Sequence, residues 1–106
     1  MTAAKTPDNC QTMADVRAGV DALDRELVDL LARRFGYMRA AARIKPGRDQ
    51  VRDEPRKAQV IAAAQAAAAD LGVPEEMVAR LWDDLVETSI AYELREWDRL
   101  RSADKA

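Results

Sequence analysis

The stretch MADVRAGVDALDRELVDLLARRFGYMRAAARIK, residues 13–45, has apolar side chains three or four residues apart along most of its length. This spacing puts them on one face of an α-helix and predicts a single helix over the whole stretch. Pro46 and Gly47 end the helix, because proline cannot continue it. At about 1.5 Å per residue the helix is about 50 Å long. The apolar positions are Met13, Val16, Val20, Leu23, Leu27, Leu30, Leu31, Phe35 and Met38.

Two more helices and a charged loop follow. The loop is PGRDQVRD, residues 46–53. The second helix runs through the alanine-rich stretch AQVIAAAQAAAADL and stops at Gly72, and its alanines let other helices approach closely. The third helix covers about residues 74–101. We expect one all-α domain with three helices, with an N-terminal extension over residues 1–12 and a frayed tail over residues 102–106.

Residues suited to capping mark the ends of the helices. Thr12 can cap the first helix, with Asp15 in its first turn, where a carboxylate interacts favourably with the helix dipole. Asp53 can cap the second helix, and Pro55 fits the first turn, where a missing N–H does little harm. Gly72 is the residue type that commonly ends a helix.

The composition excludes several kinds of site. The 106 residues include no histidine, which rules out imidazole relays and imidazole metal sites. The lone cysteine, Cys10, cannot form an intrachain disulfide or a cysteine zinc cluster. The net charge of −2 argues against a nucleic-acid surface. The chain has no apolar run of about 18 residues and no signal-peptide stretch, so we expect a cytoplasmic protein that binds neither membranes nor nucleic acids.

The length of the first helix bears on the oligomeric state. A globular monomer of 11.8 kDa cannot cover so long a rod. A second copy of the chain is the simplest source of a partner surface. We therefore expect a homodimer in which the long helices cross between protomers. The alternative is a monomeric three-helix bundle.

Two cations of the first helix face the same way. Arg34 follows Leu27 by seven residues, and its neighbours at three and four residues offer no acid to pair with it. Lys45 is eleven residues further on, a rotation of about 20° and a rise of about 16 Å. At this spacing the two side chains could hold the two ends of a small dianion. The alternative is that they are solvated surface charges.

Arg17 is a third candidate for the same ligand. It lies about 25 Å from Arg34 along the helix and points about 100° away, so one small ligand cannot touch both on the same helix. If Arg17 belongs to the site, it comes from the other protomer. An ordinary ion pair with Asp21, four residues on, is the alternative.

Glu93 interrupts the apolar pattern of the third helix, and Ser89 lies one turn before it. Glu93 comes seven residues after Val86 and four before Trp97, and no cation close by on this helix neutralises it. Desolvation raises the pKa of a carboxyl in such surroundings and favours the protonated, hydrogen-donating form. A nearby arginine or lysine would oppose that shift. A tertiary ion pair in the core is the alternative.

Arginines bracket the predicted start of the second helix. They are Arg48, Arg52 and Arg56, with Asp53 among them. Because the N–H groups at a helix N-terminus attract negative charge, arginines placed there make an anion site. The alternative is that the charged loop is only solvated.

Four features together resemble the all-α chorismate mutases across nearly the whole chain. They are LDRELVDLLARR (23–34), Lys45, VRDEPR (51–56) and LVETSIAYE (85–93). Two stretches also resemble the isochorismate pyruvate-lyases, which share the fold, namely KTPDNC (5–10) and ADVRAGVDALD (14–24). None of these features is specific alone, but their order and spacing are.

The resemblance implies an intertwined helical homodimer with two equivalent sites, each built from both protomers. It implies that Arg34 and the partner's Arg17 bind the carboxylates of the substrate. Lys45 matches a lysine that contacts a carboxylate and the ether oxygen, and Glu93 matches a residue that faces this oxygen from the opposite side. Many relatives have glutamine in place of Glu93, although some have glutamate.

Further positions match polar residues of the family. Arg56 and Asp53 match a pair that helps to hold a carboxylate and the ring hydroxyl. Ser89 matches a polar contact on the third helix. Lys57 departs from the pattern, because the mutases often have a glutamate there that assists the ring hydroxyl.

The activity that the resemblance implies is the rearrangement of chorismate to prephenate, without nucleophile, metal or cofactor. The arginines would restrain the substrate, and Lys45 with protonated Glu93 would stabilise negative charge on the ether oxygen. Arg52, Asp53 and Ser89 favour this reaction, whereas KTPDNC favours the cleavage of isochorismate to salicylate and pyruvate. A 4-amino-chorismate substrate and a non-catalytic helical dimer that acts as an interaction or regulatory module are further alternatives.

Overall fold

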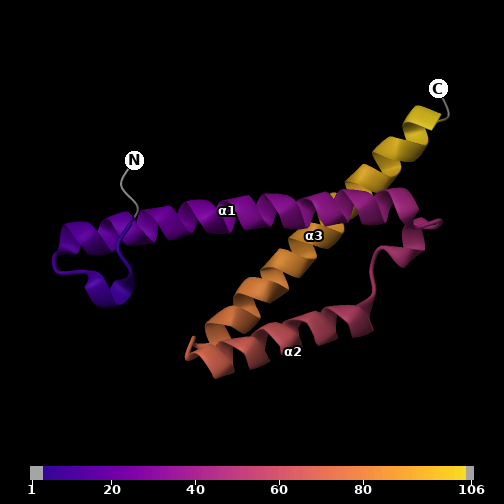
Figure 1. The fold of residues 1–106 in the computed structure, drawn as a ribbon. Helices are drawn as coiled ribbons and strands as arrows, with labels where there is room; N and C mark the ends of the chain where they lie inside the picture. Colours follow the sequence, from indigo (N-terminus) through magenta and orange to yellow (C-terminus); the bar gives the residue numbers. More distant parts are fainter. Residues whose placement is uncertain (1–3, 105–106) are drawn as a thin grey trace. The chain divides into compact units, whose positions relative to one another are not determined.

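The computed structural model describes residues 4–104, which form helices joined by short connections (Figure 1). No strand occurs among these residues, so the prediction of an all-α chain with three helices, one of them long, is confirmed. The chain divides into two compact units between Gly36 and Tyr37. In chain order the elements are the 3-10 helix η1 (Pro7–Asn9), α1 (Met13–Ile44), the 3-10 helix η2 (Arg48–Gln50), α2 (Glu54–Leu71) and α3 (Glu75–Asp104).

Reciprocal hydrogen bonds fix the start of α1, where the sequence predicts a cap. The Thr12 hydroxyl accepts from the Asp15 N–H at 3.1 Å, and the Asp15 carboxylate accepts from the Thr12 N–H at 3.3 Å. The Gln11 N–H and the Lys5 ammonium donate to the same carboxylate, and these bonds lower the pKa of Asp15. Because donors of the first turn are satisfied in this way, α1 begins at Met13.

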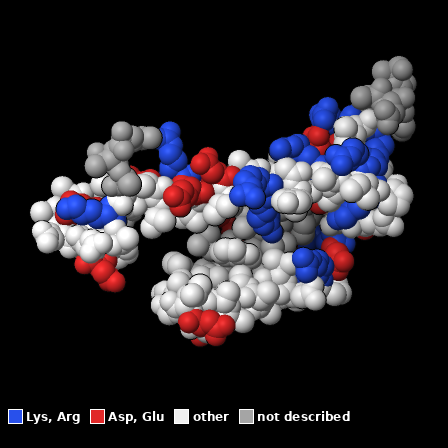
Figure 2. Space-filling view, viewed as in Figure 1, with Lys and Arg blue, Asp and Glu red and all other residues white. Residues whose placement is uncertain are grey.

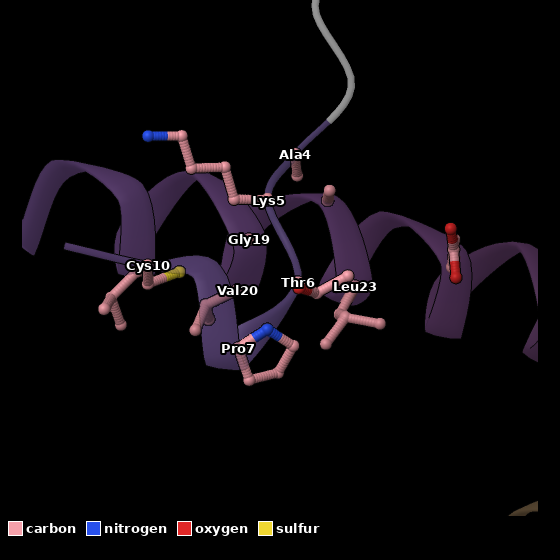
Figure 3. A pocket seen from close by; sticks show the side chains of 11 residues that line it. Ala4, Lys5, Thr6, Pro7, Cys10, Gly19, Val20 and Leu23 are labelled. Atoms are coloured by element: carbon pink, nitrogen blue, oxygen red, sulfur yellow. The ribbon is translucent and has the colours of Figure 1, made fainter. Parts of the chain in front are cut away.

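In the first unit the segment before α1 folds back along this helix (Figure 3). Between them is a pocket of about 440 Å³. Pro7 and the half-buried free thiol of Cys10 line it from the segment, and Val20 and Leu23 line it from α1. The wall is therefore mostly apolar, and η1 provides one side of it.

Much of the apolar stripe of α1 is exposed. Leu23 and Leu27 are each 56% exposed, although both belong to the pattern that predicts the helix. Full burial of one such side chain stabilises a fold by about 1.5–3 kcal/mol, so an uncovered stripe favours association with another surface. We call these residues the α1 apolar face: Met13, Val16, Val20, Leu23, Leu27, Leu30 and Leu31.

In the second unit α2 and α3 form a helical hairpin that turns at Gly72 (Figure 1). Gly72 has a φ of 73°, a left-handed conformation that suits glycine. Its N–H and that of Val73 donate to the last carbonyl groups of α2. At the other end of α2 the Asp53 carboxylate accepts from the Arg56 N–H at 3.0 Å. Both predicted ends of this helix are confirmed.

A small apolar core holds the loop between α1 and α2 against the hairpin. Val51 is only 4% exposed and packs against Val86 and Ile90 of α3. Val60 of α2 and Leu94 of α3 pack at the edge of this core. The loop is therefore anchored at its C-terminal end, just before α2 begins.

The alanine-rich sequence of α2 leaves its surface largely uncharged on the face shown in Figure 2, whereas acidic and basic side chains mix over other elements. Within residues 4–104, no helix has the length and apolar character that a membrane span requires. The same residues include no group of three His, Cys, Asp or Glu side chains that could hold a metal ion.

Two helix ends differ slightly from the predicted ones. α1 ends at Ile44, one residue before the predicted end. α3 continues to Asp104 instead of ending at Arg101, because no glycine or proline follows that would stop it. The frayed tail predicted over residues 102–106 is therefore helical as far as it is described, and residues 105–106 lie outside the described part of the chain.

Candidate active site

Lys45 and Glu93 meet inside the second unit. Nζ of Lys45 lies 2.8 Å from Oε2 of Glu93. The Glu93 side chain is 5% exposed and the Lys45 side chain 30%. The Lys45 ammonium also lies 3.5 Å from the carbonyl oxygen of Val51, in the loop. A cation and a carboxyl group are thus brought together beside the small apolar core.

This contact corrects one part of the sequence interpretation. Along its own helix Glu93 has no neutralising cation, but the end of α1 provides one. Pro46 follows Lys45 directly, and a residue before proline is driven out of the helical conformation. Lys45 therefore leaves α1, and its side chain reaches α3. The structure thus contains the tertiary ion pair that was the alternative interpretation of Glu93. This pairing offsets the free-energy cost of burying a lone carboxylate.

Ser89 lies one helical turn before Glu93 on the buried side of α3. It is 3% exposed, and its hydroxyl donates to the Leu85 carbonyl oxygen at 2.6 Å. Because residues four positions apart share a helix face, α3 presents a hydroxyl and a carboxyl on consecutive turns. Both are polar groups on a face that otherwise builds the apolar core.

Two further residues contact the backbone of Lys45, and neither stands out as a site residue in the sequence. The Trp97 indole N–H donates to the Lys45 carbonyl oxygen at 3.0 Å. The Arg101 guanidinium donates to the same oxygen at 2.7 Å and to the Ala42 carbonyl oxygen at 2.6 Å. The apolar pattern assigned Trp97 to the core and Arg101 to the end of the helix. Trp97 follows Glu93 by four residues and Arg101 follows Trp97 by four, and this spacing along one helix face is the signal that could have found them.

Two basic residues near the start of α2 form ion pairs with acids of the second unit. The Arg52 guanidinium donates to Glu87 at 2.8 and 3.0 Å and to Glu54 at 2.8 Å. The Lys57 ammonium lies 2.8 Å from Glu87 and 3.0 Å from Asp83. Hydrogen bonds from Arg52 and Lys57 lower the pKa of Glu87 to about 2. We call these residues the Glu87 cluster: Arg52, Glu54, Lys57, Asp83 and Glu87.

Arg48 is paired as well, since its guanidinium donates to both carboxylate oxygens of Asp98, at 2.9 and 3.3 Å. These bonds raise the pKa of Arg48. Arg48 and Arg52 therefore do not form the predicted anion site, because both are bound to acids of α3. Arg56 is the member of the set without a carboxylate partner in the described chain.

Arg56 and Asp53 stand together at the start of α2. The Asp53 carboxylate accepts from the Arg56 N–H, so it acts there as a helix cap. The Arg56 guanidinium is exposed and donates to the Gln59 side chain at 2.6 Å. It lines an open groove of about 590 Å³ whose other residues are Gln59, Val60, Ala63, Ala64 and Trp82.

Arg17 and Arg34 belong to the first unit. Arg17 is exposed, and in the part of the chain described it makes no ion pair with Asp21 or any other acid. Arg34 is partly buried, and this burial lowers the pKa of its guanidinium. The second unit brings Lys45, Ser89 and Glu93 together. The roles of the two arginines stay predictions.

Comparisons with known proteins match the chain over nearly its whole length. The pattern of the family described as chorismate mutase type II matches residues 16–94. An isochorismate pyruvate lyase from Pseudomonas aeruginosa is 29% identical over 99 residues, which cover 93% of this chain and 98% of that protein. The candidate site residues all fall within residues 16–94, whereas Trp97 and Arg101 follow that range.

Proposed function

Because this chain belongs to the chorismate mutase type II family, we propose that it rearranges chorismate to prephenate. The observation that carries the proposal is the contact of Lys45 with the buried Glu93 at 2.8 Å. A reaction in which negative charge develops on one oxygen needs a cation and a hydrogen-bond donor at that point. The reaction needs no nucleophile, because it rearranges bonds of the substrate itself.

Lys45 supplies the positive charge in this proposal. As the C–O bond to the ether oxygen breaks, negative charge grows on that oxygen. An ammonium placed there stabilises the transition state more than the ground state and therefore raises kcat. The Lys45 side chain is 30% exposed, which leaves it room to move away from Glu93 and admit the substrate oxygen between them.

Glu93 supplies the contact from the opposite side, in its protonated form. Its side chain is 5% exposed and is carried by the middle of α3, so the helix sets its position. The hydroxyl of Ser89, one turn away, offers the substrate a further polar contact.

The arginines hold the substrate in its reactive conformation. Guanidinium groups bind carboxylates through two parallel hydrogen bonds, which fixes the orientation of the ligand as well as its position. We assign this role to Arg34, to Arg17 from a second copy of the chain and to Arg56. Asp53, beside Arg56 at the start of α2, helps to hold the ring hydroxyl of the substrate. The exposed α1 apolar face supports a homodimer, as does the Arg17 side chain, which has no ion pair within residues 4–104.

A second candidate is the cleavage of isochorismate to salicylate and pyruvate at the same site. It is favoured by the relative from Pseudomonas aeruginosa, which this chain matches over 98% of that protein's length. The similarity to that protein therefore extends beyond the site residues. Both substrates are dianions of similar shape, so the same arginines and Lys45 serve either reaction.

The deciding experiment gives the purified protein chorismate and isochorismate in parallel. We expect loss of chorismate absorbance with formation of prephenate, and a large loss of this activity in Lys45→Met and Glu93→Ala. Arg33→Met, an exposed neighbour of Arg34, is the matched control and should keep wild-type activity. Salicylate fluorescence from isochorismate without turnover of chorismate would assign the lyase instead. No turnover of either substrate would leave the chain as a non-catalytic helical protein.

A further inference from the structure

We propose that Trp97 and Arg101 are positioning residues for Lys45. They hold the C-terminal end of α1 by its carbonyl groups and so keep the Lys45 ammonium beside Glu93. Neither side chain lies within the range that the family match covers. The role in catalysis rests on the proposed function, whereas the role in placing Lys45 can be measured without it.

The end of α1 needs outside donors because of Pro46. In a continuing helix, the N–H of residue 46 would donate to the carbonyl of Ala42, four residues before it. Proline has no N–H, so this carbonyl loses its helical partner. Ala42 is 0% exposed, and water therefore cannot take the place of the missing donor. The Arg101 guanidinium supplies the hydrogen bond at 2.6 Å.

The carbonyl group of Lys45 itself is held from two sides. It accepts from the Trp97 indole at 3.0 Å and from the Arg101 guanidinium at 2.7 Å. The guanidinium stacks on the Trp97 ring, 4.3 Å from its centre, so each side chain fixes the other. A positive charge at this position also suits the negative end of the α1 dipole.

Three residues of α3 thereby act on the residue that directly follows α1. Glu93, Trp97 and Arg101 are spaced by four, which places them along one face of α3. Glu93 contacts the side-chain end of Lys45, and the other two contact its backbone end. With its backbone end held by the helix that carries Glu93, Lys45 keeps its ammonium within reach of Glu93 and of a substrate oxygen that enters between them. Such placement matters because a displacement of about 1 Å can lower a rate by about 100-fold.

The kinetic test compares Arg101→Met with Arg99→Met. Arg99 is an exposed arginine of the same helix whose partner is Glu96, so it is a matched control for the loss of one cation. We expect Arg101→Met to lower kcat by about 10- to 100-fold with little change in KM, because Lys45 acts in the transition state. Arg101→Lys should recover part of the loss, since an ammonium can donate to one of the two carbonyl groups. Trp97→Phe, which keeps the ring and loses the N–H, should show a smaller fall in kcat.

A double substitution separates positioning from general stability. In a Lys45→Met background, Arg101→Met should have little further effect on kcat, while it lowers the thermal unfolding midpoint as much as in the wild-type background. If Arg101→Met lowers kcat by the same factor in both backgrounds, it acts through stability and the proposal is wrong. Unchanged kcat in Arg101→Met would also overturn it.

A readout that does not depend on turnover uses the lysine ammonium signals in nitrogen-15 NMR spectra. The chain has four lysines, and the Lys45 signal is the one that Lys45→Met removes. We expect a slowly exchanging Lys45 signal in the wild type and in Arg99→Met, and its loss in Arg101→Met. If wild-type protein turns over neither substrate, the proposed function fails and this spectrum still decides the placement of Lys45. A Lys45 signal that is the same in all three proteins would contradict the proposal.

Discussion

Lys45 and Glu93 are 48 residues apart in the sequence, yet Nζ of the lysine lies 2.8 Å from Oε2 of the glutamate. Within this pair the glutamate is nearly buried and the lysine is partly exposed. The two side chains therefore have unequal freedom to move. In the proposed mechanism, a substrate oxygen that enters between them would displace the lysine and meet a carboxyl group that stays in place.

Replacing Glu93 by glutamine should preserve activity that replacement by alanine removes. The proposed mechanism needs a hydrogen-bond donor at this position, and the glutamine amide donates whereas an alanine side chain does not. The measurement is kcat/KM of Glu93→Gln and Glu93→Ala beside the wild type. Equal losses in the two variants would remove the donor role from Glu93.

Replacing Arg34 by alanine should reduce kcat/KM by roughly 10²–10³-fold, the size of effect seen when one charged or polar transition-state contact is lost. Arg34 is partly buried, and burial lowers the pKa of its guanidinium, so an anionic ligand gains from it more than from a solvated arginine. Arg33→Ala, one position away and exposed, is the control. Equal activity in the two variants would exclude Arg34 from the site.

The α1 apolar face should associate with a second copy of the chain. Sedimentation equilibrium should give about twice 11.8 kDa. Leu27→Lys places a charge in the middle of this face and should shift the protein toward monomer. Val28→Lys is the control, because Val28 is 63% exposed and lies off the stripe. A monomer in wild-type protein would contradict the proposed homodimer.

Mixing two inactive proteins tests whether the sites are shared. If each site takes Arg34 from one copy and Arg17 from the other, a heterodimer of Arg17→Ala and Arg34→Ala has one intact site. Activity should therefore reappear when the two proteins exchange subunits, and it should be absent in each alone. Exchange that is demonstrated by mass, with no recovery of activity, would show that the sites are not shared.

The Glu87 cluster should stabilise the fold in a defined pH range. Arg52 and Lys57 lower the pKa of Glu87 to about 2 from the ordinary value of 4.5. Because the folded-state pKa is the lower one, the stabilisation is present above about pH 4.5 and is lost as pH falls toward 2. Glu87→Gln should therefore lower the unfolding midpoint at neutral pH, and the difference from wild type should shrink in acid.

Thermal unfolding followed by circular dichroism across this pH range is the measurement. Asp84→Asn is the control, because Asp84 is an exposed acid of α3 without an ion pair in the described chain. Its difference from wild type should stay small throughout. A difference between Glu87→Gln and wild type that does not change with pH would mean that Glu87 acts through packing and not through its charge.

The helices could be read from the sequence because their signals are local. Thr12 and Asp15 are three residues apart, and their reciprocal bonds fix the start of α1 without help from elsewhere. Gly72 ends α2 through its own conformation and the carbonyl groups just before it. Such features depend on neighbours along the chain, and the sequence displays those neighbours directly.

The partners of the charged side chains could not be read in the same way. Arg52 binds Glu87 across 35 residues, and nothing near Arg52 in the sequence distinguishes that pair from an open anion site. The cation for Glu93 likewise comes from another helix. Trp97 and Arg101 have a visible spacing, but the carbonyl groups they serve belong to the end of α1. Tertiary packing decides these contacts.

The placement of Val51 sets a boundary for engineering this enzyme class. The residues before it in the loop, Arg48 to Gln50, are exposed, whereas Val51 is packed between two side chains of α3. A loop transplanted from a relative can therefore vary at the exposed residues Asp49 and Gln50, which have no partner in α3 within the described chain, while the core of the hairpin is kept. The graft has to end in a side chain of the same shape, because Val51 is the point at which the loop joins the core of the hairpin.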